Sequence, residues 1–124
     1  MEKPSALAAF GALSQTTRLD TFRLLVRHGA AGLAAGDIAR KLKVPQNTMS
    51  AHLAVLARAG LVASTRQSRS IVYRPNLDVL DALTEFLGGI AATAGVILAE
   101  PPPRRALADH SQASLEPSAR KLVE

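Results

Sequence analysis

The chain has 124 residues, a net charge of +5 at neutral pH and a sequence pI near 10.5. This length fits one domain with a tail, and the positive charge favours an anionic partner. The absence of cysteine excludes disulfide bonds and thiolate chemistry. Three scattered histidines, no glycine-rich phosphate loop and no clustered carboxylates leave nothing to build an active site from, so we expect no enzyme and no cofactor.

The sequence predicts a protein of the cytoplasm. Its first 13 residues contain no long apolar run after the initial charges, so we expect no signal peptide. The apolar stretch from Ile90 to Ala99 is about half the length needed to cross a bilayer.

Two helices are expected before residue 29. Residues 4–13 form the first, and its large apolar residues Leu7, Phe10 and Leu13 could serve a dimer interface or cover the core. The second helix spans Ser14–His28, with a predicted core stripe of Leu19, Phe22, Leu25 and Val26.

A third helix is expected within residues 32–44, with Leu33, Ile38 and Leu42 as its apolar side. Asp37 falls in its first turn, where the helix dipole favours a carboxylate, and we read it as a charge without a ligand role.

Residues 44–62 predict a fourth helix that begins near Pro45 and ends at Gly60. One stripe is apolar (Met49, Leu53 and Leu56). The opposite side carries small or polar residues rather than lysine and glutamate: Asn47, Ala51, Ala54 and Arg58, flanked by Thr48 and Ser50. Such a face can approach DNA closely and pair with base edges, although small residues also suit a helix buried in a bundle.

A hairpin follows this helix. Val62–Arg66 and Ser70–Arg74 predict two strands around Gln67, Ser68 and Arg69. Two helices joined by a short turn and followed by a basic hairpin predict a winged helix-turn-helix.

The charge pattern supports this interpretation. Residues 40–74 contain no acid and seven cations, namely Arg40, Lys41, Lys43, Arg58, Arg66, Arg69 and Arg74. A surface with one sign of charge over the helix and the hairpin is typical of phosphate binding.

The last helix begins after Pro75-Asn76 and has an apolar stripe that needs a partner, which we expect to be a second copy of the chain. Gly88-Gly89 is a point at which this helix either ends or kinks, and residues 91–99 are apolar or small and suit its continuation. The three prolines at 101–103 mark a boundary between a folded domain at residues 1–100 and a disordered tail at 101–124.

Three segments carry a family resemblance: ALSQTTRLDTFRLLV, QNTMSAHLAVLARAGLV and RQSRSIVYR. They resemble the ArsR/SmtB family of bacterial winged-helix repressors, over roughly Leu7 to Leu87. The resemblance implies a homodimer that represses its own operon and releases DNA on sensing a signal, often a metal or metalloid ion. It also favours a dimer interface between the first and last helices, at Leu7, Phe10, Leu77, Leu80, Leu83 and Leu87.

The chain departs from each sensor pattern of that family. Where some members have Cys-x-Cys before the aspartate, this chain has Ala34 and Gly36. Its last helix has acids but no zinc-binding histidine, and the cysteine pair of the arsenic sensors would fall near Ala91 and Ala92. We therefore expect no metal site; either another signal is sensed, or the sensor cysteines were lost or engineered away.

We expect a homodimeric, sequence-specific repressor related to arsenic-resistance regulators, with an unknown inducer. Two alternatives remain: a winged helix that docks a protein partner, and a repressor that answers to a non-metal signal. In the DNA-binding interpretation, one group reads bases (Gln46, Asn47, Ser50 and Ala51) and another holds phosphate or sugar (Lys41, Lys43, Thr48, His52 and Arg58). Arg66 and Arg69 take the wing to the backbone or minor groove.

Overall fold

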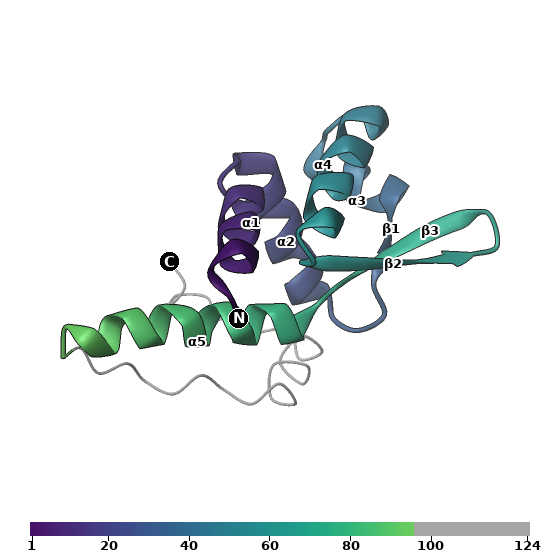
Figure 1. Ribbon diagram of the computed structural model, residues 1–124. Coiled ribbons are helices and arrows are strands. Elements are labelled where there is room, and N and C mark those ends of the chain that lie inside the picture. Colours follow the sequence, from purple (N-terminus) through teal and green to yellow (C-terminus); the bar gives the residue numbers. More distant parts are fainter. Residues whose placement is uncertain (96–124) are drawn as a thin grey trace, which may run out of the picture.

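The computed structural model describes residues 1–95, which form helices around a small three-stranded sheet (Figure 1). The order of elements is α1 (Lys3–Leu13), α2 (Thr16–His28), β1 (Leu33–Ala34), α3 (Ala35–Leu42), α4 (Gln46–Arg58), β2 (Val62–Gln67), β3 (Ser70–Pro75) and α5 (Leu77–Thr93). The tail expected at residues 101–124 lies outside the described residues. Within residues 1–95, no helix is long and apolar enough to span a membrane.

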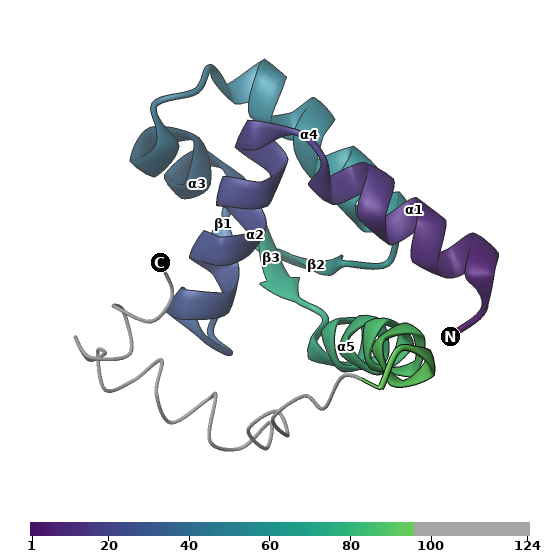
Figure 2. The ribbon, with the colours of Figure 1, turned by 90° about the vertical axis from the view of Figure 1, so that its left-hand side faces the viewer.

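Helix α1 packs through alanines. Ala6, Ala9 and Ala12 are buried, whereas Leu7 is 59% exposed. Three alanines at a spacing of three residues make a flat helix face, so α1 can lie close to α2 and α4 (Figure 2). Its larger apolar residues are thereby left for other contacts.

The core stripe predicted for α2 is wrong at one position. Phe22 and Leu25 are buried and Val26 is half-buried, but Leu19 is 40% exposed. Thr21 is fully buried in the core instead. Its hydroxyl donates to the Thr17 carbonyl at 2.7 Å, which satisfies this polar group inside the apolar interior.

The sheet contains a strand that the sequence did not predict. Leu33 does not belong to the third helix, because β1 pairs antiparallel with β3 and places Leu33 opposite Tyr73. The sheet order is β1-β3-β2, so β3 is central. Gly32, at φ +77°, lets the chain enter β1 so close to β3 that a Cβ there would lie 2.8 Å from the Tyr73 carbonyl oxygen.

Helices α3 and α4 form the expected helix-turn-helix. Met49, Leu53 and Leu56 of α4 are fully buried, as the apolar stripe predicted. At the other end of α4, Gly60 has φ +80° and the Leu61 N–H donates to the Leu56 carbonyl at 3.0 Å. This glycine-based helix end is the one expected from the sequence, and it turns the chain directly into β2.

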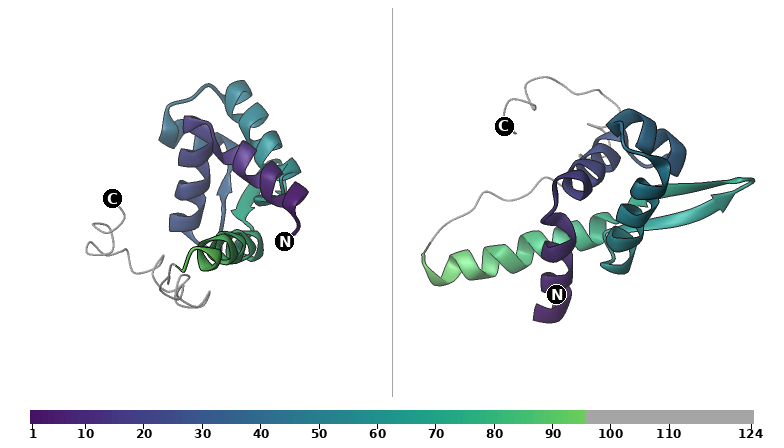
Figure 3. Two further views of the ribbon diagram at one scale, coloured as in Figure 1. Left: turned by 60° about the vertical axis from the view of Figure 1, so that its left-hand side comes forward. Right: turned by 90° about the horizontal axis from the view of Figure 1, so that it is seen from above.

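Helix α5 starts at a residue that also contacts the end of α4. The Asn76 side chain accepts from the Asp78 N–H at 3.2 Å and donates to the Gly60 carbonyl at 3.1 Å. The Asn76 N–H donates to the Leu61 carbonyl at 2.9 Å. Gly88-Gly89 neither ends nor interrupts α5, which continues to Thr93. The β2–β3 hairpin and the C-terminal part of α5 extend from opposite sides of the body (Figures 1 and 3).

Candidate nucleic-acid interface

The surface of α4 opposite its buried stripe is open to solvent. All of the polar residues of its first turns are exposed, and so are the alanines that follow: Gln46, Asn47, Thr48, Ser50, Ala51 and Ala54. The Asn47 Oδ1 accepts from the Thr48 N–H at 2.9 Å, which leaves its Nδ2 free to donate. A helix with small side chains on its open face can enter a groove deeply.

The cations of residues 40–74 differ in what they contact. Arg40 pairs with Asp37, and Arg74 donates to the Ala30 carbonyl at 3.1 Å and to Thr65 Oγ1 at 3.2 Å. Arg74 is half-buried and therefore supports the local structure, whereas Arg40 is exposed and its charge is balanced by Asp37. The other five are exposed and can meet phosphates: Lys41, Lys43, Arg58, Arg66 and Arg69.

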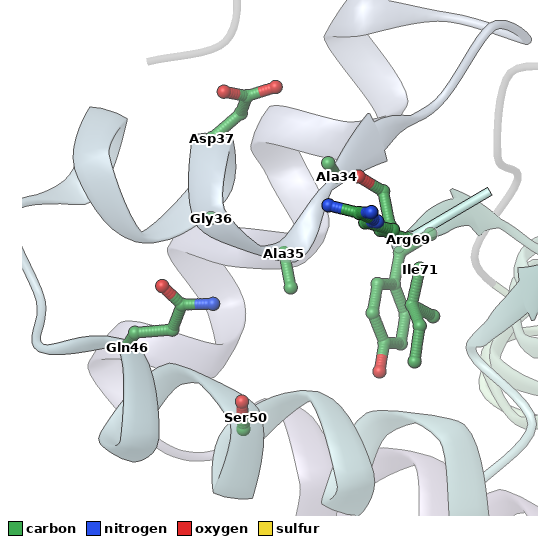
Figure 4. Close-up of a pocket in the computed structure, with 10 residues that line it drawn as sticks. Ala34, Ala35, Gly36, Asp37, Gln46, Ser50, Arg69 and Ile71 are labelled. Carbon is green, nitrogen blue, oxygen red and sulfur yellow. The ribbon is translucent and has the colours of Figure 1, made fainter. Parts of the chain in front are cut away.

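One cavity of about 440 Å³ lies between the hairpin and the starts of α3 and α4 (Figure 4). Three residues predicted to contact DNA line it together: Gln46, Ser50 and Arg69. Figure 4 shows the Gln46 amide and the Ser50 hydroxyl directed into this space and the Asp37 carboxylate directed away from it. The open cavity therefore presents mostly neutral and cationic groups.

Sequence reasoning missed part of this cavity. Ala34, Ala35 and Gly36 form one wall, and Ser70 and Ile71 line another. The serine- and arginine-rich hairpin could have indicated Ser70. Nothing in the sequence indicated the wall at residues 34–36, because that segment was read as helix and not as the end of a strand.

A second groove, of about 490 Å³, runs along the turn between α3 and α4 and includes Lys43 and Gln46. Not all predicted contacts lie together, however. Arg58 is at the far end of α4, about 18 Å along the axis from Gln46 at 1.5 Å per residue. The predicted DNA contacts therefore extend along the whole helix rather than forming one pocket.

His52 lies beside the open face and is half-buried. Its Nδ1 is 3.5 Å from Nη1 of Arg18, a residue of α2. Sequence reasoning placed His52 among the phosphate or sugar contacts and did not identify Arg18 as its neighbour within the chain.

Comparison with known proteins identifies the family. A helix-turn-helix domain family matches residues 13–65, which include the two helices and the turn. The transcriptional activator HlyU of Vibrio cholerae is 30% identical over 89 residues, 70% of this chain and 80% of HlyU. An ArsR-like transcriptional regulator from Rhodococcus sp. RHA1 has 29% identity and a TM-score of 0.66, over 90% of this chain and 93% of its own. The chain belongs to the ArsR-like family of winged-helix transcriptional regulators.

The predicted fold class and the general function of this ArsR-like protein are thereby confirmed: it is a winged helix-turn-helix, DNA-binding transcriptional regulator. A further similar structure is a homodimeric winged helix-turn-helix DNA-binding domain from Mycobacterium bovis, described as a possible ArsR-family regulator. It has 25% identity and a TM-score of 0.58, over 78% of this chain and 89% of its own.

The residues predicted for a dimer interface occupy two kinds of position in this ArsR-like chain. Leu7 and Leu87 are exposed, at 59% and 49%, and Ile90, which the prediction did not include, is 55% exposed. The others pack within the chain to different degrees: Phe10, Leu77 and Leu80 are half-buried and Leu83 is buried. The rings of Phe10 and Phe86 lie 6.3 Å apart, so α1 rests on α5.

No group of three or more potential metal-binding side chains occurs within residues 1–95 of this ArsR-like regulator. Ala34 and Gly36, which occupy the cysteine positions of one sensor pattern, line the cavity beside the hairpin. Ala91 and Ala92, near the other, lie in the last turn of α5. None of these four positions offers a side-chain ligand.

Proposed function

We propose that this protein is a homodimeric, sequence-specific repressor that inserts α4 into the major groove of operator DNA. One observation carries this proposal: two surface features occur together. The exposed face of α4 has small side chains, and the helix-turn-helix and hairpin around it carry exposed cations in a segment without acids. On such a surface the cations contact DNA phosphates, and the small-residue face of α4 contacts the base edges. It acts in the cytoplasm, with residues 1–100 as the DNA-binding and dimerisation domain.

Each predicted contact has a place in this arrangement. Gln46, Asn47, Ser50 and Ala51 read bases from the first turns of α4, the part of a recognition helix that usually reaches base edges. Thr48, His52, Lys41, Lys43 and Arg58 hold phosphate or sugar around it. Arg66 and Arg69 of the hairpin meet the backbone or the minor groove beside the site.

The dimer is formed by α1 and α5. Exposed Leu7, Leu87 and Ile90 support this part of the proposal, because large apolar side chains on two neighbouring helices favour a second copy. The homodimeric relative from Mycobacterium bovis supports it as well. Two recognition helices then meet half-sites about 34 Å apart.

The signal that releases DNA is not read by thiolates, because the chain has no cysteine. Regulation of an arsenic-resistance operon would therefore require a different site for the metalloid. A non-metal signal needs only to shift the DNA equilibrium by about 1–3 kcal/mol, which a small organic molecule between the dimer helices can supply.

Fluorescence anisotropy of the full chain against its own upstream DNA, with and without arsenite, tests this proposal. The expected result is tight, salt-dependent binding that arsenite leaves unchanged. Release by arsenite would reveal a metalloid site without cysteine and would overturn the assignment of a non-arsenic signal. Absence of DNA binding even at low salt would overturn the assignment as a repressor and would favour a winged helix that docks a protein partner.

Asn47→Ala is expected to weaken binding to the cognate operator by roughly 1–3 kcal/mol and to relax the preference at one base position. The reason is that an asparagine amide can pair with an adenine edge in the major groove. Binding curves on the cognate site, on single-base variants and on random DNA measure both effects. Equal losses on cognate and random DNA would contradict the base-reading role.

Arg69→Ala is expected to weaken binding to all sequences alike and to lower the slope of log affinity against log salt by about one unit. Arg69 is an exposed cation at the hairpin turn, where it can meet a phosphate but lies outside the base-reading helix. Arg27→Ala serves as the matched control, because Arg27 is exposed on α2 and outside the acid-free segment. A loss confined to the cognate site would show that Arg69 reads sequence instead.

A further inference from the structure

Arg18 is a half-buried cation whose side chain joins the end of α1 to α4. Its Nε donates to the Ala12 carbonyl at 2.7 Å, and its Nη2 lies 3.5 Å from the Gly11 carbonyl. Both carbonyls belong to the last turn of α1, which has no basic residue of its own. A cation is favoured at this end of a helix, so these contacts fix the direction of the guanidinium.

The same guanidinium faces the recognition helix. Its Nη1 approaches His52 Nδ1 at 3.5 Å (α1 and α4 lie side by side in Figure 2). A guanidinium carries only donors, so Nδ1 of His52 must be the acceptor. In a neutral imidazole the proton then resides on Nε2, at the other side of the ring.

That second ring nitrogen is available for a ligand. Within residues 1–95, Nε2 of His52 has no hydrogen-bond partner, and the side chain is only half-buried. His52 follows the exposed Thr48 by one helical turn, so both side chains lie on one flank of α4. This flank borders the base-reading face, where a recognition helix meets the DNA backbone.

We propose that Arg18 is a positioning residue for DNA binding, because it holds His52 in the tautomer whose Nε2–H donates to a DNA phosphate. This inference rests on the proposed entry of α4 into DNA. A neutral donor adds affinity without neutralising a phosphate charge. Loss of the contact therefore lowers affinity but leaves the salt slope unchanged, in contrast to the loss of a cation.

Nitrogen NMR of the full chain, without DNA, tests the first half of the proposal. In mildly alkaline buffer, where histidine rings are neutral, the ¹⁵N shifts of His52 should report a proton on Nε2. Arg18→Gln should convert this signature into a mixture of tautomers, whereas Arg23→Gln, a change at an exposed arginine of the same helix, should not. A proton on Nδ1 in the unmodified protein would overturn the proposal.

Two substitutions of His52 separate its nitrogens. His52→Asn keeps an acceptor near the place of Nδ1 but removes the outer donor, whereas His52→Gln keeps a donor near the place of Nε2. We expect His52→Asn to bind DNA about tenfold more weakly, as for loss of one hydrogen bond to a charged acceptor. His52→Gln, which keeps the outer donor, should lose several-fold less affinity than His52→Asn, and neither should change the salt slope. Equal losses in both variants would overturn the proposal.

Combining the substitutions tests whether Arg18 acts through His52. Arg18→Gln should weaken DNA binding in the unmodified chain but add little in the His52→Asn background. Independent, multiplying losses would show that Arg18 contributes only by stabilising α1, and would overturn the inference. Thermal denaturation first establishes that each variant is folded; if Arg18→Gln is not, the tautomer of the unmodified chain and the His52 pair decide the matter. A chain that does not bind DNA at all refutes the proposed function, while the tautomer still decides the Arg18–His52 relation.

Discussion

Leu87→Glu is expected to convert the regulator from the proposed dimer into a folded monomer and to lower its affinity for a two-half-site operator by about 100-fold or more. Leu87 is 49% exposed on α5, so a charge there is tolerated by the single chain. In the proposed dimer the same side chain is covered by a second copy, and burying an unpaired carboxylate is costly. A monomer contacts only one half-site at a time, so its affinity falls to that of a single half-site.

Light scattering after size exclusion, together with anisotropy on DNA with one or two half-sites, measures this result. Ala92→Glu provides the control, since it adds the same charge to an exposed position on another side of α5. The control should remain dimeric and bind DNA normally. A Leu87→Glu protein that stays dimeric would refute the assignment of this α5 face to the interface.

Gly32→Ala is expected to destabilise the fold by about 2–5 kcal/mol, through left-handed backbone strain and through overpacking. Gly32 has φ +77°, and an added Cβ would lie 2.8 Å from the Tyr73 carbonyl oxygen and from side-chain atoms of Val72 and Arg74. The carbonyl belongs to the central strand of the sheet and cannot move aside without breaking its pairing. Urea denaturation followed by circular dichroism gives the free energy of unfolding.

Gly11→Ala is the matched control for that experiment. Gly11 lies within α1, and an added Cβ there would meet nothing within 4 Å. Alanine in a helix is favoured over glycine by about 0.5–1 kcal/mol, so this variant should be slightly more stable than the unmodified chain. Similar stabilities for Gly32→Ala and Gly11→Ala would contradict the close approach of Gly32 to β3.

The sequence predicted the recognition helix well, because several local signals agreed there. The spacing of Met49, Leu53 and Leu56 matched one helical face, and all three are buried. Pro45 and Gly60 bracket the helix at positions where their backbone preferences apply. Polar and small residues on the opposite face then predicted its exposure, which the structure bears out.

The errors occurred where tertiary contacts outweigh local pattern. Leu33 is apolar in either a helix or a strand, and only its pairing with Tyr73, far along the chain, makes it a strand residue. The buried side of α1 consists of alanines, which a search for large apolar residues passes over. Leu19 of the predicted stripe is exposed, whereas Thr21, which was not part of that stripe, is buried with its hydroxyl satisfied by the Thr17 carbonyl.

The site could be predicted only in part for the same reason. Residues on α4 and the hairpin follow from the sequence, because both elements are continuous segments. The contact between Arg18 and His52 joins residues 34 positions apart, and the cavity wall at Ala34–Gly36 depends on the strand that was missed. Such features arise from packing between elements, which periodicity does not encode.

The hydrogen bonds of Asn76 connect the C-terminal end of α4 to the N-terminal end of α5. Three hydrogen bonds join Asn76 to Gly60, Leu61 and Asp78. The end of α4 and the start of α5 are therefore held together at one residue. A tilt of α5 at the proposed dimer axis would therefore move the C-terminal end of α4 as well. In the proposed dimer, the angle between the two copies of α5 would then set the distance between the two recognition helices. A signal that changes this angle would release DNA without contacting the DNA-binding face.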